Sequence, residues 1–334
     1  MREFHFFIRA LVLATLLSQI RPAHAQESPQ EKPQAIHVSV ERVNVGVIVT
    51  NSNGHFVEGL RREDFHVLDN GAEQPLTDFA AIEAPAQVLL LIEAGPAVYL
   101  LEGGHLEAAL ALLNGLAAGD RVAVVKYAEA PTALLDFTPD KQAAQAAFGQ
   151  LRFNLGFSAL NLSSSVTKVL EWLASVQGKK SVVLLSTGVD TSPSNEAALV
   201  MQRLKINDVR LLAVSLTGGL QNPQPANKKK SAARASTQAA QEFEQADQLL
   251  KRLAESTGGR AYFPRNSGEF SAAYAEIAQL VRHEYSLAFA PPARDGLVHV
   301  IEVRVDAPKT STLNAPLPSY RVDHRQAYLA PGHQ

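Results

Sequence analysis

The chain has 334 residues, of which 46% are hydrophobic, so it is long enough for one or two domains with substantial cores. Its formal net charge is −2 at pH 7, which gives no overall attraction to nucleic acid or to an anionic membrane. The sequence contains no cysteine, and this excludes disulfides, thiolate metal sites and cysteine nucleophiles.

Residues 1–25 have the pattern of a cleaved signal peptide. A basic start that includes Arg9 precedes the short apolar run 10–20, and Ala23-His24-Ala25 matches an A-x-A cleavage signature. The apolar run is too short to span a membrane, which takes about 20 apolar residues. We therefore expect a periplasmic or secreted protein with no membrane span, beginning with a polar linker over residues 26–35.

Residues 36–83 are expected to form an N-terminal β segment, because apolar and polar residues alternate with period two and turn residues separate the runs. Asp69-Asn70-Gly71 is typical of a hairpin turn. The expected strands are residues 36–49, 56–60, 65–69 and 76–82.

Residues 86–283 alternate short apolar runs with longer periodic segments, a pattern that predicts a parallel sheet covered by helices on both faces. The expected strands are 88–92, 122–127, 182–185 and 210–216, with weaker ones at 133–137 and 261–263. The expected helices are 106–116, 141–151, 162–176, 195–206, 238–256 and 269–282. Residues 218–238, rich in Pro, Asn, Lys and Ala, are expected to be a mobile surface loop. Its three consecutive lysines are a weak signal for nucleic acid, and none is expected as a partner.

Residues 284–330 return to β patterns, with expected strands at 285–290, 298–305 and 321–328. Each terminal segment has too few strands to be stable alone. We therefore expect the two segments to form one small β-sandwich-like unit.

Two apolar runs carry a family resemblance. Gln87-Val-Leu-Leu-Leu-Ile-Glu-Ala-Gly-Pro-Ala97 and Lys180-Ser-Val-Val-Leu-Leu-Ser-Thr-Gly-Val-Asp190 resemble the first and fourth strands of the von Willebrand factor type A (VWA) fold, a Rossmann-like doubly wound sheet. The motif over residues 54–71, with Gly54, Asp64-Phe65 and Asp69-Asn70-Gly71, is similar to VWA-related proteins described from Acidobacteria, and so is the tail with Arg325-Gln-Ala-Tyr328. The resemblance covers nearly all of the expected mature chain.

The resemblance implies a metal-ion-dependent adhesion site (MIDAS) at the carboxyl ends of these strands, but the matched positions hold few suitable ligands. Mg²⁺ needs octahedral oxygen coordination and usually one or two carboxylates. The candidate binding face consists of Glu93, Gly95, Ala97, Ser158, Thr187 and Asp190. Gly and Ala offer no side-chain oxygen, and Thr187 stands in place of an aspartate. We therefore expect a degenerate MIDAS with no metal, in which Glu93 accepts hydrogen bonds from helix N-terminal N–H groups.

Other chemistry finds little support in the sequence. No G-x-S-x-G, H-E-x-x-H or phosphate-loop motif is present, so no catalytic residue and no cofactor are assigned. His37, His55, His66 and His299 are expected at surfaces or sheet edges, and Trp172 in a core. The sequence thus predicts an exported, non-enzymatic VWA-type module for protein interaction or assembly, with a protein partner at the cell envelope. Two alternatives stay open: a metal-dependent adhesion module using Glu93, Ser158 and Asp190, and a hydrolase on the same face.

Overall fold

The computed structural model describes residues 42–83, 85–95, 104–152, 159–218, 237–306 and 320–332. All of them belong to one compact unit, Glu41–Gln334. The expected signal peptide, the linker and nearly all of the loop 218–238 lie outside the described residues.

The central sheet has six strands in the order β10-β9-β8-β5-β6-β7. Its strands are β5 (Ala86–Glu93), β6 (Arg121–Tyr127), β7 (Pro131–Thr138), β8 (Lys179–Ser186), β9 (Val209–Ser215) and β10 (Ala261–Tyr262). Four of the five pairings are parallel. The four central strands, β5, β6, β8 and β9, are nearly continuous apolar runs because helices cover both faces of the sheet.

The edge strand β7 differs from the all-parallel expectation, since it pairs antiparallel with β6. Only residues 128–130 connect the two strands. A parallel crossover needs a dozen or more residues, so this short connection dictates a hairpin.

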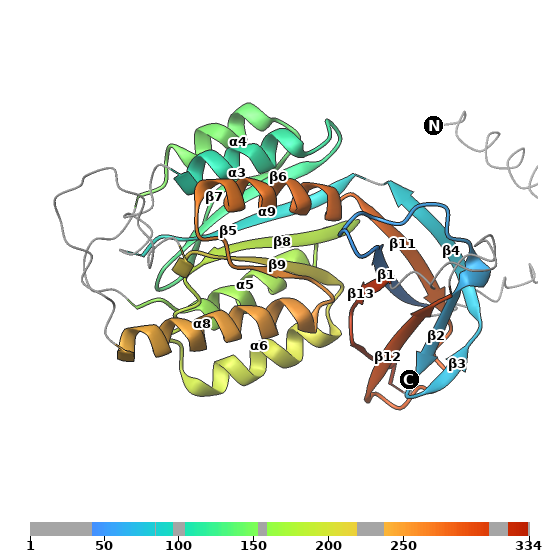
Figure 1. Ribbon diagram of the computed structural model, residues 1–334. Helices are drawn as coiled ribbons and strands as arrows, with labels where there is room; N and C mark the ends of the chain where they lie inside the picture. Colours follow the sequence, from blue (N-terminus) through green and yellow to red (C-terminus); the bar gives the residue numbers. More distant parts are fainter. Residues whose placement is uncertain are drawn as a thin grey trace, which may run out of the picture. The chain divides into compact units, whose positions relative to one another are not determined.

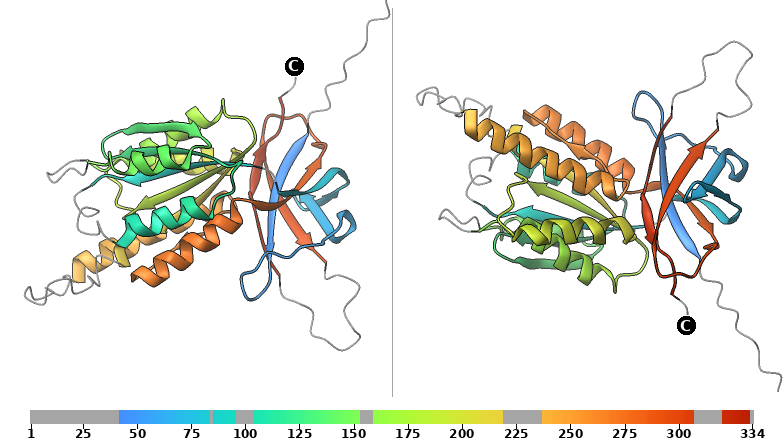
Figure 2. Two further views of the ribbon diagram at one scale, coloured as in Figure 1. Left: turned by 90° about the horizontal axis from the view of Figure 1, so that it is seen from above. Right: turned by 90° about the horizontal axis from the view of Figure 1, so that it is seen from below.

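Helices cover both faces of the central sheet, as Figures 1 and 2 show. One layer contains α3 (Gly104–Gly115), α4 (Lys141–Phe148) and α9 (Ser267–Leu280), and the other contains α5 (Leu162–Leu173), α6 (Ser194–Ile206) and α8 (Thr237–Ser256). Alternate residues of β5 supply the two cores: Leu90 packs in the α3–α9 core and Leu91 in the α5–α8 core. Side-chain caps mark the starts of α4 and α9: the Asp140 carboxylate accepts from the N–H groups of the first turn of α4, and the Asn266 side chain accepts from Glu269 N in α9.

Two four-stranded antiparallel sheets accompany the central one. The order in the first is β13-β1-β11-β4, with β1 (Val43–Thr50), β4 (Leu76–Glu83), β11 (His283–Phe289) and β13 (Arg321–His324). The order in the second is β14-β12-β2-β3, with β2 (Phe65–Asp69), β3 (Ala72–Gln74), β12 (Val298–Val305) and β14 (Ala327–Leu329). A 3-10 helix, η1 (Arg62–Asp64), leads into β2. In both sheets, strands from the N-terminal segment pair with strands from the C-terminal segment.

The two antiparallel sheets enclose a core of their own, to which Val47 and Tyr285 contribute from one sheet and Val67 and Ile301 from the other. Ile48, on the opposite side of β1, packs instead in the α3–α9 core. The fold-class prediction is confirmed: a VWA-type, Rossmann-like α/β sheet is combined with a small β-sandwich built from both ends of the chain. No helix among the described residues is long and apolar enough to cross a membrane.

Three local expectations were wrong. Residues 56–60 form no strand, only an isolated bridge between Phe56 and Thr50. The backbone of this segment bonds instead to the Tyr285 hydroxyl, which donates to Val57 O (2.7 Å) and accepts from Leu60 N (3.2 Å). The expected strand 321–328 is two strands in different sheets. His299 is buried rather than exposed, because it shares the inward-facing side of β12 with Ile301 and Val303, and Asp69 accepts a hydrogen bond from its ring at 2.7 Å.

Candidate functional site

Glu93 ends β5 and is fully buried at the carboxyl edge of the central sheet. Its Oε2 accepts hydrogen bonds from the Thr187 backbone N–H (2.8 Å) and hydroxyl (2.8 Å), and from the hydroxyls of Ser186 (3.0 Å) and Tyr127 (3.3 Å). The Thr187 hydroxyl also lies 3.0 Å from Oε1. The carboxylate therefore joins the ends of β5, β6 and β8.

The donors come from β6, from β8 and from the residue after β8. The expected donors, N–H groups at a helix N-terminus, do not supply these bonds. Parallel pairing explains the difference: Ile92 lies opposite Leu185, so the next residues, Glu93 and Ser186, emerge side by side at the strand ends.

The electrostatics of this cluster reflect its burial. Burial raises the pKa of Glu93, and the hydrogen bonds from Thr187, Ser186 and Tyr127 lower it only in part. Burial and the nearby Glu93 charge also raise the pKa of Tyr127 well above its usual value, which keeps the phenol protonated as a donor. The cluster is suited to holding the ends of the three strands together.

Gly95 is needed because another side chain occupies the space beside it. A Cβ atom at Gly95 would lie 2.9 Å from Leu160 Cδ2 and 3.2 Å from Glu93 Oε1. Leu160 is itself buried, so an apolar group packs next to the carboxylate at the position where a VWA metal site would present a serine oxygen.

Asp190 is half-buried and caps the start of α5. Its Oδ2 accepts from the Ser163 hydroxyl (2.5 Å) and backbone N–H (3.3 Å), and its Oδ1 accepts from Ser192 N (2.9 Å). Asp190 and Glu93 thus belong to separate hydrogen-bond networks. Ala97 and Ser158 lie outside the described residues.

The described residues do not fit a divalent metal at this position. Glu93 is the single carboxylate among the described residues of its cluster, and the hydroxyls of Thr187, Ser186 and Tyr127 form one hydrogen-bond network with it, in which the Tyr127 and Ser186 oxygens lie 2.6 Å apart. Throughout the part of the chain that the structure describes, no three His, Asp or Glu side chains are grouped so that they could hold a metal ion.

Sequence reasoning missed Tyr127, Ser186 and Leu160. A signal for the first two was available, because Tyr127 and Ser186 both end strands that were expected beside β5. A third carboxylate at the same edge follows the same rule: Asp247 of α8 accepts from the hydroxyls of Ser215 (2.6 Å) and Thr217 (2.9 Å) beyond β9. Neutral hydroxyls, and not cations, hold the carboxylates of this edge.

No protein-family model matches the sequence, and no curated protein matches it. Solved structures of similar fold include a von Willebrand factor type A protein from Catenulispora acidiphila (11% identity, TM-score 0.44, covering 88% of this chain and 75% of that one). An aerotolerance-related membrane protein from Bacteroides fragilis NCTC 9343 is 13% identical, with TM-score 0.43, over 59% of this chain and 98% of its own. Manganese-loaded TRAP protein from Plasmodium vivax is 12% identical, with TM-score 0.40, over 80% of this chain and 100% of its own. At such similarity the fold assignment rests on the strand order and core of this chain itself.

Proposed function

We propose that the chain is an exported, non-enzymatic VWA-type module that binds a protein partner at the cell envelope without a metal ion. The segments 36–83 and 284–330 serve in this proposal as one β unit beside the VWA domain 86–283. Processing after Ala25 belongs to the same proposal, and N-terminal sequencing of the mature protein should begin at Gln26.

One observation carries the interaction role: an apolar strip on the outer side of the second antiparallel sheet. Leu297, Val298, Val300 and Leu329 are between 53% and 63% exposed. Val298 lies directly opposite Leu329 in the β12–β14 pairing, and Val300 is the next outward-facing residue of β12. Several large apolar side chains gathered on one exposed face mark an interaction surface more often than scattered single ones do.

The sequence-based candidate face at the carboxyl edge remains a second location for binding. Glu93, Gly95 and Thr187 are buried, so a partner there would contact the surrounding loops, which include the half-buried Asp190. The proposal of a metal-independent mode rests on the Glu93 cluster, whose carboxylate is already held by four donors from Thr187, Ser186 and Tyr127.

The proposal that the chain is not an enzyme rests on two features of its serines: whether a substrate can reach them and whether a histidine base lies beside them. Ser186 and Ser163, the serines bonded to Glu93 and Asp190, are fully buried, which keeps a substrate carbonyl away from their oxygens. Ser164, bonded to Glu196, is more open, but no histidine contacts it among the described residues. Ser164 is therefore the serine with which to test the hydrolase alternative, by comparing Ser164→Ala with the wild type on ester substrates.

Crosslinking the mature protein in envelope extract tests the proposal. A double variant, Val298→Ser with Val300→Ser, should remove the partner band, because it makes the strip polar while leaving the inward-facing residues of β12 unchanged. Glu302→Ser, an exposed change on the same strand, is the matched control and should keep the band. A band that persists in the double variant but disappears with Asp190→Ala would move binding to the carboxyl edge. A band that requires Mg²⁺ would contradict metal-independent binding.

A further inference from the structure

A cavity of about 430 Å³ lies at the amino-terminal edge of the central sheet, where β8 and β9 begin and where β1 and β11 cross them. Its charged lining consists of Lys179, Lys180, Arg210, Arg325, Asp208 and Glu284. Four cations face two anions, so the lining carries a net charge of 4 − 2 = +2. The volume falls in the range of small-molecule sites, about 300–1,000 Å³.

Lys179 is a buried cation of this lining that shares its carboxylate partner with a second cation. Its side chain is 9% exposed, and Nζ lies 3.5 Å from Glu284 Oε2. That same oxygen is 3.4 Å from Arg210 Nη2, so two cations share one carboxylate oxygen. Among the described residues, none accepts a hydrogen bond from Lys179 Nζ.

Two further donors of the lining are also without a hydrogen-bond partner among the described residues: Ser181 Oγ and Arg325 Nε. Ser181 is 1% exposed and lies two residues after Lys179 on β8, so both side chains are on the same side of the strand. Ser181 is also paired in register with Arg210 of β9. Buried donors usually have partners, so these three mark a place where acceptor oxygens are missing.

If the charged residues of this cavity served only to hold strands together, each would have protein partners, and this is true of only some of them. Arg210 does have structural partners, since it donates to Gly258 O at 2.8 Å and to Gly46 O at 3.2 Å and so joins β9 to β1. Among the described residues, Lys179 Nζ has no such backbone acceptor. Burial, together with the charge of Arg210, lowers its pKa to about 8, and the nearby Glu284 offsets this only in part.

We propose that this cavity binds a small oxyanion, the phosphate or carboxylate group of a small molecule, with Lys179, Ser181 and Arg325 as donors. Phosphate and carboxylate share the required chemistry, namely several acceptor oxygens and negative charge opposite an excess of cations. The site lies at the edge of the sheet opposite Glu93 and does not depend on the proposed protein-interaction role.

The test is isothermal titration and thermal unfolding of the mature protein with inorganic phosphate and, separately, with citrate, against chloride at equal ionic strength. We expect saturable binding and a raised melting temperature with at least one oxyanion, and the stronger of the two identifies the headgroup class. Lys179→Met should abolish binding. Ser181→Ala, which removes one hydrogen bond from a small side chain, should weaken it by about tenfold.

Lys251→Met is the matched control, because Lys251 is half-exposed on α8, pairs with Glu255 and does not line the cavity. It should bind like the wild type. Equal stabilisation by chloride, or no binding of either oxyanion, would overturn the proposal. Binding that is unchanged in both single variants, Ser181→Ala and Lys179→Met, would also overturn the proposal, because the anion would then bind at another site.

Discussion

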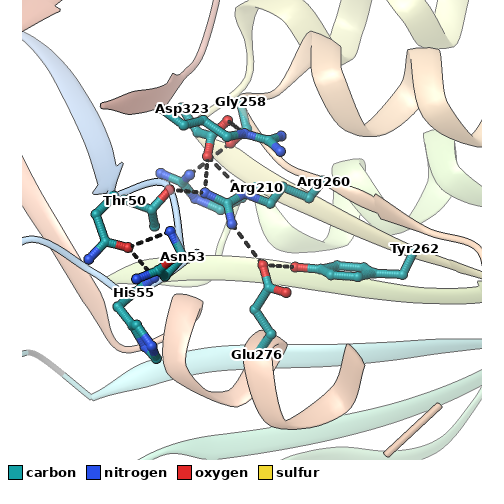
Figure 3. A network of polar contacts seen from close by, with 11 residues as sticks. Thr50, Asn53, His55, Arg210, Gly258, Arg260, Tyr262, Glu276 and Asp323 are labelled. Atoms are coloured by element: carbon teal, nitrogen blue, oxygen red, sulfur yellow. Dashed lines mark hydrogen bonds and ion pairs between the residues drawn. The ribbon is translucent and has the colours of Figure 1, made fainter. Parts of the chain in front are cut away.

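Arg260, just beyond α8, donates to Asp323 of β13 from two nitrogens, Nε at 2.8 Å and Nη2 at 2.5 Å, both to Oδ2. Figure 3 shows the guanidinium placed between Asp323, Thr50 of β1 and Glu276 of α9. A residue of the α/β region thus fixes strands from both ends of the chain.

Removal of this arginine should loosen the attachment of β13 and β1. Arg260 is 6% exposed, and Arg260→Met removes the cation from Asp323 Oδ2, so that Arg321, whose Nε lies 2.9 Å from Oδ1, remains as the partner of this carboxylate. Breaking a buried pair on one side costs about 3–5 kcal/mol of unfolding free energy, and the remaining Arg321 contact places this variant at the low end, about 3 kcal/mol. Urea unfolding measures this. Arg203→Met, which breaks the exposed pair with Glu171, is the control and should cost about 0–1 kcal/mol. Equal losses in both variants would contradict the role assigned to Arg260.

Glu93→Gln should destabilise the fold by about 1–3 kcal/mol, because the amide places donor hydrogens against the donors of Thr187, Ser186 and Tyr127. Chemical denaturation checks the value. Glu129→Gln changes an exposed carboxylate close to the same edge and should be neutral. If Glu93→Gln were as stable as the wild type, the carboxylate would not be holding the strand ends together.

Divalent cations should leave the melting temperature unchanged. A micromolar site at millimolar metal would stabilise the native state by about 4 kcal/mol through mass action. Thermal unfolding with Mg²⁺, Mn²⁺ or Ca²⁺ against chelator is the measurement. A reproducible stabilisation that Glu93→Ala removes would restore the adhesion-site alternative.

Gly188→Ala should be more harmful than Gly178→Ala, although both glycines have positive φ, +74° and +91°. At Gly178 the added methyl meets open space, so only the left-handed backbone penalty of about 1–2 kcal/mol applies. At Gly188 the new Cβ would lie 2.5 Å from the Ala246 carbonyl oxygen of α8, so α8 must also shift. Comparison of the two unfolding free energies tests this, and equal losses would contradict the close approach.

Because of His299, the stability of the folded protein should depend on pH above the ordinary histidine pKa of 6.5. Hydrogen bonds from its ring to Asp295 and Asp69 raise its pKa in the folded protein, and Tyr328 donates to the same Asp69 at 2.6 Å. A raised pKa means that the stabilisation is complete below pH 6.5 and is lost as pH rises through the folded value. The fall in melting temperature from pH 6 to pH 9 should therefore be smaller in His299→Gln than in the wild type. His66, whose pKa is also raised, contributes equally to both proteins and cancels. An identical fall in both would refute the assignment.

The sequence by itself determined the α/β alternation, because strands buried on both faces must be apolar throughout and helices must keep one apolar side. It also predicts a VWA-type metal site with few ligands, since Gly95 and Thr187 cannot supply carboxylates whatever the fold does.

Only the tertiary structure decided the partners of Glu93. Tyr127 and Ser186 meet its carboxylate through the register of neighbouring strands, and no local pattern relates residues separated by 34 or 93 positions. The same holds for His299, which alternation turns inward on β12 but whose partner, Asp69, lies 230 residues earlier in the chain. Local periodicity reports which side of an element is buried, whereas the partner of a buried polar group depends on how distant segments pair.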